Sequence, residues 1–146
     1  MKKISVLFVC LGNICRSPAA EAIFLNLLEE KGLTDKFIVD SAGTGSWHIG
    51  KRADSRMRNA AERRDINILS RARQITSKDF DAFNYILAMD DSNFRNIQDL
   101  KNRTASTGFA SIKKMQDFRS VFNEQEVPDP YFGAVSYTHL TLPTKA

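Results

Sequence analysis

The sequence is poor in cysteine and has no long apolar run, and each scarcity excludes a class of protein. Only Cys10 and Cys15 are cysteines among 146 residues, too few for the disulfide framework of a small secreted domain or for a structural zinc site. No apolar stretch approaches the roughly 20 residues that cross a bilayer, and the apolar run 4–9 is too short for a signal peptide. We therefore expect a cytoplasmic protein without a membrane partner.

The composition that remains is that of an ordinary globular domain. Hydrophobic residues make up 42% of the chain and charged residues 26%, which is enough apolar material for a single core. The two cysteines lie close together in the sequence, and this proximity suggests chemistry rather than cross-linking.

The net charge of +4 is concentrated in one segment. Residues 51–73 contain eight basic and three acidic side chains, a pattern that can steer anionic partners but more often marks a solvated helix face. No aromatic residue interrupts the segment, so it lacks the stacking platforms of single-stranded nucleic acid binders. We expect no nucleic acid partner.

Strand and helix signals alternate along the chain. Residues 4–9 form an apolar run typical of a strand buried on both faces. Ser17 as N-cap and Pro18 in the first turn predict a helix whose apolar residues recur at helical spacing until Gly32. Further strands are expected at 37–39, 85–89 and near 110–115, and helices at 54–64 and from 90–92 through 100. This order predicts a single α/β domain, a doubly wound four-stranded parallel sheet flanked by helices, with ligands at the carboxyl ends of the strands.

The stretch from Cys10 to Arg16 joins the first strand to the first helix and has the composition of an anion cradle. Backbone N–H groups of residues 11–16 can converge on a tetrahedral anion, Gly12 permits the tight path, and Arg16 can clamp two oxygens. This positive environment favours the thiolate form of Cys10, a nucleophile to which Ser17 could donate a hydrogen bond. Each residue alone has an ordinary explanation, as core side chain, turn glycine, surface arginine or helix cap. Their joint spacing favours a phosphate-binding loop, which lacks the glycines and lysine of a Walker-type loop.

Residues 9–18 closely resemble the active-site loop of the low-molecular-weight protein tyrosine phosphatases, and residues 127–133 resemble the loop that carries that family's catalytic acid. Segments 41–44, 72–75 and 85–90 also resemble family segments, so the resemblance covers residues 4–133.

The resemblance implies hydrolysis of phosphotyrosine in proteins without metal or cofactor. Cys10 would attack phosphorus, Arg16 and the loop amides would hold the oxygens, and Asp129 would act as general acid and then as base around a cysteinyl-phosphate. Asp129 could otherwise be a turn aspartate between two prolines. Tyrosine-phosphorylated proteins are the expected partners of a monomer or weak homo-oligomer.

The same resemblance assigns supporting roles. Trp47, Tyr131 and Phe132 would wall a deep slot that favours phosphotyrosine over phosphoserine, although Trp47 could instead be a core aromatic. Cys15 would form a reversible disulfide with Cys10 that protects the nucleophile, or would be an inert thiol. The loop and the polar set that supports it comprise Leu11, Gly12, Asn13, Ile14, Cys15, Ser17 and Ser41, with Ser70 where well-studied members place a histidine.

Other functions are weighed against this one. A protein-arginine phosphatase of the same family typically has threonine where this chain has Ile14, which favours tyrosine. An arsenate reductase needs a third cysteine, and a cysteine hydrolase needs a histidine base, whereas His48 and His139 have no recognisable orienting context. A catalytically silent phosphotyrosine-binding module would keep Arg16 but lose the nucleophile or the acid, and Cys10 and Asp129 are both present.

The last residues depart from the family pattern. The resemblance implies a C-terminal helix after the Asp129 loop, but residues 134–146 lack a helical apolar period and contain Pro143. We therefore divide the chain into a domain at 1–133 and an atypical tail at 134–146. Loss of the last helix would expose an apolar strip and reduce stability.

Overall fold

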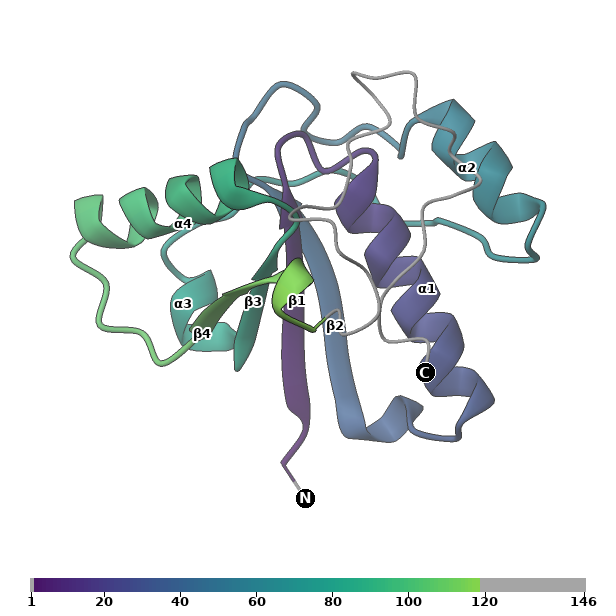
Figure 1. The fold of residues 1–146 in the computed structure, drawn as a ribbon, viewed down its shortest axis with the longest axis horizontal. Helices are drawn as coiled ribbons and strands as arrows, with labels where there is room; N and C mark the ends of the chain where they lie inside the picture. Colours follow the sequence, from purple (N-terminus) through teal and green to yellow (C-terminus); the bar gives the residue numbers. More distant parts are fainter. Residues whose placement is uncertain (1, 119–146) are drawn as a thin grey trace.

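A computed structural model describes residues 2–118. Strands and helices alternate along most of this range, with three short helices between or after them (Figure 1). In chain order the elements are β1 (Ile4–Cys10), α1 (Arg16–Glu30), η1 (Thr34–Lys36), β2 (Phe37–Gly43), α2 (Ser55–Glu62), α3 (Asp79–Ala82), β3 (Tyr85–Ala88), α4 (Asp91–Arg103), β4 (Ser111–Lys114) and η2 (Met115–Phe118).

The four strands form one parallel sheet in the order β2-β1-β3-β4. The strand β1 lies in the middle and pairs along its whole length with β2, from Ile4 opposite Phe37 to Cys10 opposite Gly43. The order reverses direction at β1, so Cys10 ends the strand at the switch point where ligands of such sheets bind. The predicted doubly wound parallel sheet is confirmed.

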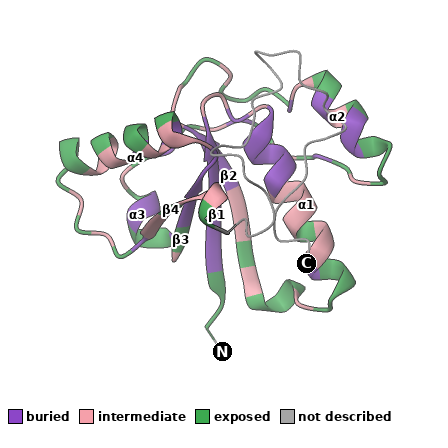
Figure 2. Cartoon of the chain, viewed as in Figure 1, coloured by how far each residue is buried: buried purple, intermediate pink, exposed green. Residues whose placement is uncertain are grey.

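Alternate residues of β1 face opposite layers. Leu7 and Val9 are fully buried in a cluster with side chains of α3 and α4, whereas Phe8 and Cys10 lie in a second cluster with Ala20 of α1. Figure 1 shows α1 and α2 on one side of the sheet and α3 and α4 on the other, and Figure 2 shows the buried strands between these layers. The side chain of Cys10 therefore lies on the α1 side of the sheet.

The start of α1 differs from the prediction. The helix begins at Arg16 and its N-cap is Cys15, so Ser17 lies inside the first turn and is not the cap. The Ser17 hydroxyl contacts Cys10 instead. Pro18 is still in the first turn, where backbone N–H groups have no helical partner.

The end of α1 follows the prediction. Gly32 has a φ of 68°, its N–H donates to Glu29, and the N–H of Leu33 donates to Leu28. These two bonds form the Schellman motif, for which glycine is the favoured residue.

The remaining predicted elements are present with shifted ends. Asp54 caps α2 and Asp90 caps α4, and α4 continues to Arg103, beyond the expected end at residue 100. The short helix α3 was not predicted. Among residues 2–118, no helix is long and apolar enough to cross a membrane. Asp129, Tyr131, Phe132, His139 and the tail 134–146, where we expect the family's last helix to be missing, lie outside the described residues.

Candidate active site

The loop after β1 holds Cys10 beside the first turn of α1. The sulfur of Cys10 lies 2.9 Å from the hydroxyl oxygen of Ser17 and accepts the backbone N–H of Asn13 at 3.3 Å. Cys10 is 3% exposed and Ser17 fully buried. The Cys10 sulfur therefore lies at a strand end, beside a helix N-terminus and in contact with a buried hydroxyl group.

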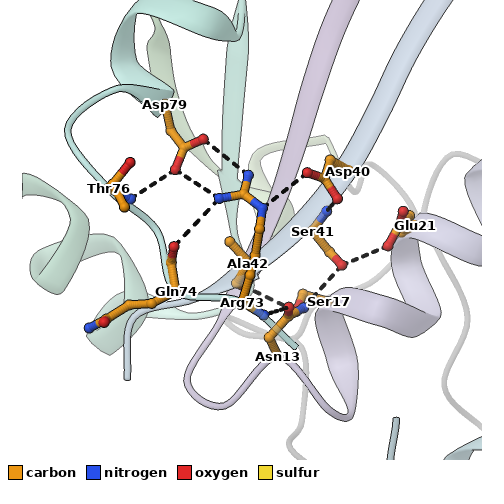
Figure 3. A network of polar contacts seen from close by, with 10 residues as sticks. All are labelled: Asn13, Ser17, Glu21, Asp40, Ser41, Ala42, Arg73, Gln74, Thr76 and Asp79. Atoms are coloured by element: carbon orange, nitrogen blue, oxygen red, sulfur yellow. Dashed lines mark hydrogen bonds and ion pairs between the residues drawn. The ribbon is translucent and has the colours of Figure 1, made fainter. Parts of the chain in front are cut away.

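Asn13 organises the polar side chains beneath the loop (Figure 3). Its amide nitrogen donates to the hydroxyls of Ser17 at 2.8 Å and Ser41 at 3.0 Å, and its amide oxygen accepts the backbone N–H of Arg73 at 2.9 Å. Its φ of 58° lies in the left-handed region, which asparagine tolerates better than most residues. Asn13 is 2% exposed, so water does not compete for these three bonds. They hold the loop against α1, β2 and the segment at Arg73.

Glu21 completes this network from α1. Its carboxylate accepts the hydroxyl of Ser41 at 2.6 Å. Burial raises the pKa of Glu21 above its ordinary value of 4.5, and the negative charge of Asp40 adds to the rise. Hydrogen bonds from Ser41 and Ser70 and the positive charge of Arg73 oppose the rise without cancelling it. Ser70 thus supports the network through Glu21.

Arg73 anchors the other side of the network. Its guanidinium donates to both oxygens of Asp79, at 3.0 and 3.1 Å, and to Asp40 at 3.1 Å (Figure 3). Burial alone would lower the pKa of Arg73, but the hydrogen bonds and charges of the two aspartates outweigh it and raise the pKa. Arg73 is thus a permanent cation that fixes the segment donating to Asn13.

Arg16 is held by an acid from the neighbouring strand end. Its Nη1 lies 2.9 Å from Oδ2 of Asp90, and the Arg16 side chain is 3% exposed. The other oxygen of Asp90 accepts the backbone N–H of Asn93 at 2.7 Å and so caps α4. The carboxylate thereby helps to set the direction of a guanidinium, a group whose planar fork suits the binding of an anion.

The backbone beyond β2 packs directly against the loop. The N–H groups of Thr44 and Gly45 donate to the carbonyls of Cys10 and Leu11 at 2.9 and 2.8 Å. A Cβ atom at Gly43 would lie 2.7 Å from the carbonyl oxygen of Leu11, so this close approach requires glycine. A Cβ atom at Gly12 would meet the ring of His48 at 2.8 Å.

Trp47 lies at the edge of the site and outside the core. Its side chain is 68% exposed, which excludes the alternative of a core aromatic. With Leu11 it lines a cavity of about 300 Å³ that extends to Leu100 and Arg103 of α4. Asp129, Tyr131 and Phe132 lie outside the described residues, so their predicted roles stay predictions.

Cys15 is buried in a different environment from Cys10. It is 4% exposed and packs with Ala53, Met57 and other apolar residues of the α2 region. Both cysteines are free thiols. The neighbouring Ile14 is half-buried against the same cluster, and its carbonyl accepts the N–H of Asp54 at 2.7 Å.

Sequence reasoning missed three charged residues of the site: Glu21, Arg73 and Asp90. Glu21 shows no local signal that separates it from other polar residues of α1, and Arg73 belongs to the basic segment 51–73. Most arginines of that segment are exposed, as expected, but Arg73 is turned inward. Asp90 was predicted only as a helix start, because its partner is 74 positions away.

The arrangement suits the capture of a tetrahedral anion over a nucleophile. A sulfur with two hydrogen-bond donors, a helix N-terminus and a fixed arginine lie on one loop. Such a site can stabilise the charge that moves during phosphoryl transfer.

Comparison with known proteins agrees with this geometry. The family model for low molecular weight phosphotyrosine protein phosphatase matches residues 5–141. A protein of that name from Schizosaccharomyces pombe is 44% identical over 133 residues, covering 90% of this chain and 83% of the relative.

Solved structures are similar in fold and sequence. The crystal structure of a protein tyrosine phosphatase from Entamoeba histolytica superposes with a TM-score of 0.84 at 44% identity, covering 94% of this chain and 86% of the other. A Drosophila arginine phosphatase superposes with a TM-score of 0.83 at 33% identity, covering 92% and 83%. The chain therefore belongs to the low molecular weight phosphotyrosine protein phosphatase family and is a protein-tyrosine phosphatase.

Proposed function

We propose that the chain hydrolyses phosphotyrosine in proteins through a covalent intermediate on Cys10. The observation that supports this best is the position of the Cys10 sulfur, 2.9 Å from the Ser17 hydroxyl and 3.3 Å from the Asn13 N–H. Both groups can donate to a thiolate, and the first turn of α1 adds positive potential at the same point. Arg16, aligned by Asp90, and the loop amides would hold the phosphoryl oxygens.

The reaction would run in two displacements. In the first, the Cys10 sulfur bonds to phosphorus, the bond from phosphorus to the phenolic oxygen breaks, and Asp129 gives its proton to the departing tyrosine. In the second, water attacks phosphorus, the sulfur–phosphorus bond breaks, and Asp129 takes the proton of the water. The products are tyrosine, inorganic phosphate and the enzyme in its starting state.

Specificity for tyrosine would come from aromatic walls around the loop. Trp47 is exposed beside Leu11 of the loop, and we propose that Tyr131 and Phe132 complete the slot. A deep slot favours an aryl phosphate, because the shorter phosphoserine would leave its phosphoryl group above the loop. Cys15 is proposed to act as a redox partner of Cys10 rather than in the displacement.

The direct test compares wild type with Cys10→Ser and Asp129→Ala on phosphotyrosine peptide and on an aryl phosphate whose leaving group needs no proton. Cys10→Ser is expected to be inactive on both substrates. Asp129→Ala is expected to lose far more activity on phosphotyrosine than on the activated ester, because only tyrosine needs protonation as it leaves. Full activity of Cys10→Ser would end the covalent mechanism, and equal losses for Asp129→Ala would end its role as general acid.

An arginine phosphatase is the second candidate, because one of the similar structures carries that activity in its name. The resemblance separates the two activities at Ile14, where a protein-arginine phosphatase of the family typically has threonine. Turnover of phosphotyrosine and phosphoarginine peptides should be measured side by side. Higher kcat/KM on phosphotyrosine is expected, and the reverse order would assign the chain to the arginine branch.

A further inference from the structure

Glu21 and Cys10 lie at the two ends of one chain of hydrogen bonds. The chain runs from the Glu21 carboxylate to Ser41 at 2.6 Å, to Asn13 at 3.0 Å, to Ser17 at 2.8 Å and to the Cys10 sulfur at 2.9 Å. The three linking side chains are no more than 2% exposed. Charges at the two ends are therefore joined through buried polar groups rather than through water, and interact more strongly than surface charges would.

The Asn13 amide donates toward both ends of this chain. The amide oxygen of Asn13 accepts from the Arg73 backbone, so both N–H bonds of the amide are directed at the serines. Each serine hydroxyl accepts from Asn13. Ser41 donates its own proton to Glu21, and Ser17 can donate to the Cys10 sulfur at 2.9 Å or to the carbonyl of Ala42 at 3.4 Å. This arrangement suits an acceptor at each end, a carboxylate and a thiolate.

The surroundings of Glu21 disfavour its charge. Asp40 on β2 faces it with a second negative charge, and Arg73, the cation nearby, is already bonded to Asp40 and Asp79. Within residues 2–118, the partners of Glu21 are the hydroxyls of Ser41 and Ser70 rather than a cation in an ion pair. The sulfur end has the positive potential of the α1 N-terminus and the loop arginine.

We propose that Glu21 is a proton-accepting positioning residue coupled to the phosphate-binding loop, which takes up a proton when an oxyanion binds above Cys10. The negative charge of the bound anion adds to that of the thiolate and is felt by Glu21 through Ser41, Asn13 and Ser17. A proton on Glu21 removes this repulsion. The inference rests on the proposed function, because it assigns the oxyanion to the loop of Cys10.

The coupling predicts a pH-dependent affinity for a simple oxyanion. Sulfate is the probe, because its own charge is constant over the pH range of interest, unlike that of phosphate. Its Kd should be measured by NMR titration of the wild type, Glu21→Gln and Glu29→Gln between pH 4.5 and about 8.

Glu21→Gln imitates the protonated carboxyl and retains an oxygen that can accept from Ser41. At pH values where Glu21 is ionised, this variant is expected to bind sulfate at least about threefold more tightly than wild type. By linkage, that ratio corresponds to a change of about half a unit in the pKa of Glu21 when sulfate binds. At acidic pH the two proteins should bind alike. Glu29→Gln removes an equal charge from an exposed position of the same helix and should follow the wild type. Equal Kd values for wild type and Glu21→Gln at every pH, or weaker binding by Glu21→Gln, would overturn the proposal.

A reciprocal measurement keeps the proposal testable if Glu21→Gln fails to fold. The ¹³C resonance of the Glu21 carboxyl is titrated in wild type, with and without saturating sulfate, and in Cys10→Ser. Sulfate is expected to move the midpoint of Glu21 upward, and Cys10→Ser to move it downward, because linkage requires the same coupling from either end. A purely structural Glu21 would keep one midpoint in all three samples, and that result contradicts the inference. Neither measurement needs turnover, so a failure here is separate from a failure of the proposed function.

Discussion

Asp90 holds Arg16 with one oxygen and begins α4 with the other. The Oδ2–Nη1 distance is 2.9 Å, and Oδ1 accepts the N–H of Asn93 at 2.7 Å. One residue thus joins the phosphate-binding loop after β1 to the helix after β3. Since Arg16 is almost fully buried, the direction of its guanidinium depends on this carboxylate.

Asp90→Asn should separate the two roles of that residue. Asparagine remains a good N-cap, so α4 should keep its start. The loss of charge removes the carboxylate that holds Nη1 of the buried Arg16, and kcat/KM on an aryl phosphate is expected to fall about tenfold or more. Steady-state kinetics and thermal unfolding of the same preparation provide the measurement.

The matched control is Asp91→Asn, which removes the same charge one position along α4. Asp91 forms a surface ion pair with Lys114 at 2.8 Å, and such pairs contribute at most about 1 kcal/mol. Its kinetics should equal those of wild type. Similar activity losses in the two variants would show that the Asp90 effect comes from the net charge of the helix and not from Arg16.

Gly43→Ala should displace the catalytic loop. The added methyl group would lie 2.7 Å from the carbonyl oxygen of Leu11, and hydrogen bonds on both sides prevent an easy retreat. We expect a stability loss of about 1–3 kcal/mol. Because a shift of about 1 Å in an active site can cost about a hundredfold, kcat/KM should fall by at least tenfold.

Gly32→Ala is the control for a general effect of replacing glycine. Gly32 has a φ of 68° and open space around its Cβ position, so alanine there is strained by its backbone alone and costs about 1 kcal/mol. Activity should be unchanged. If Gly43→Ala retains full activity at a temperature where it is folded, the loop does not depend on this close approach.

The pH dependence of stability should reveal Glu21. A carboxyl group whose pKa is raised on folding binds protons more tightly in the native state than in the unfolded chain. Its contribution to the free energy of unfolding is therefore greatest below pH 4.5 and is lost as the pH rises through the raised native value. Glu21→Gln removes this pH-dependent contribution.

Urea unfolding of wild type and Glu21→Gln at a series of pH values measures the contribution of Glu21 to the free energy of unfolding. The stability of Glu21→Gln relative to wild type should increase as the pH rises from 4.5 through the native pKa, and then level off. Glu29→Gln, at an exposed position, should not show this trend. A constant difference between wild type and Glu21→Gln would show that burial of Glu21 does not disfavour its charge.

Much of the fold was predictable because the elements carry local signals. The strand β1 is an uninterrupted apolar run, since both of its faces are covered, and Asp54 and Asp90 mark helix starts by their capping side chains. The short α3 escaped prediction because four residues are too few to show a helical period.

The loop of the site was predictable from the sequence, whereas the side chains of other elements that hold the loop were less so. The residues from Cys10 to Ser17 lie together in the sequence, and their spacing reveals them. The partners of Ser41 and Arg16 come from other elements, and no local pattern links positions so far apart. The prediction of Ser17 as a helix cap rested on serine before proline being common at helix starts, and it was wrong. The Ser17 hydroxyl instead contacts Asn13 and Cys10.

Trp47→Ala should weaken substrate binding more than it slows the chemistry. The ring is mostly exposed, so its removal should leave the fold intact. A stacked aromatic pair contributes about 0.5–1.5 kcal/mol, so the KM for an aryl phosphate is expected to rise about two- to tenfold while kcat changes little. Ile49→Ala, a 56% exposed apolar residue of the same segment, is the matched control and should have the wild-type KM. An unchanged KM for Trp47→Ala would exclude this residue from the substrate slot.

Cys15 should decide whether oxidation of the enzyme is reversible. Peroxide converts the Cys10 thiolate to a sulfenic acid and is itself reduced to water. A thiol that reaches the sulfenic acid then forms a disulfide and releases water, and an added thiol reductant restores both cysteines. Cys10 and Cys15 lie five residues apart at the two ends of the same loop, and both are buried as thiols outside any disulfide. Wild type treated with peroxide should recover most of its activity in reductant.

Cys15→Ala tests whether Cys15 makes the oxidation reversible, and it places no polar group in the apolar cluster that contains the Cys15 side chain. Its kinetics before oxidation should match those of wild type, because Cys15 has no role in the displacement. After the same peroxide treatment it should recover little activity, since the sulfenic acid proceeds to the sulfinic acid, which thiols do not reduce. Peptide mass spectrometry should show a Cys10–Cys15 disulfide in oxidised wild type and a sulfinic acid at Cys10 in the variant. Equal recovery of the two proteins would mean that Cys15 is an inert core thiol and that the protection of Cys10 comes from elsewhere.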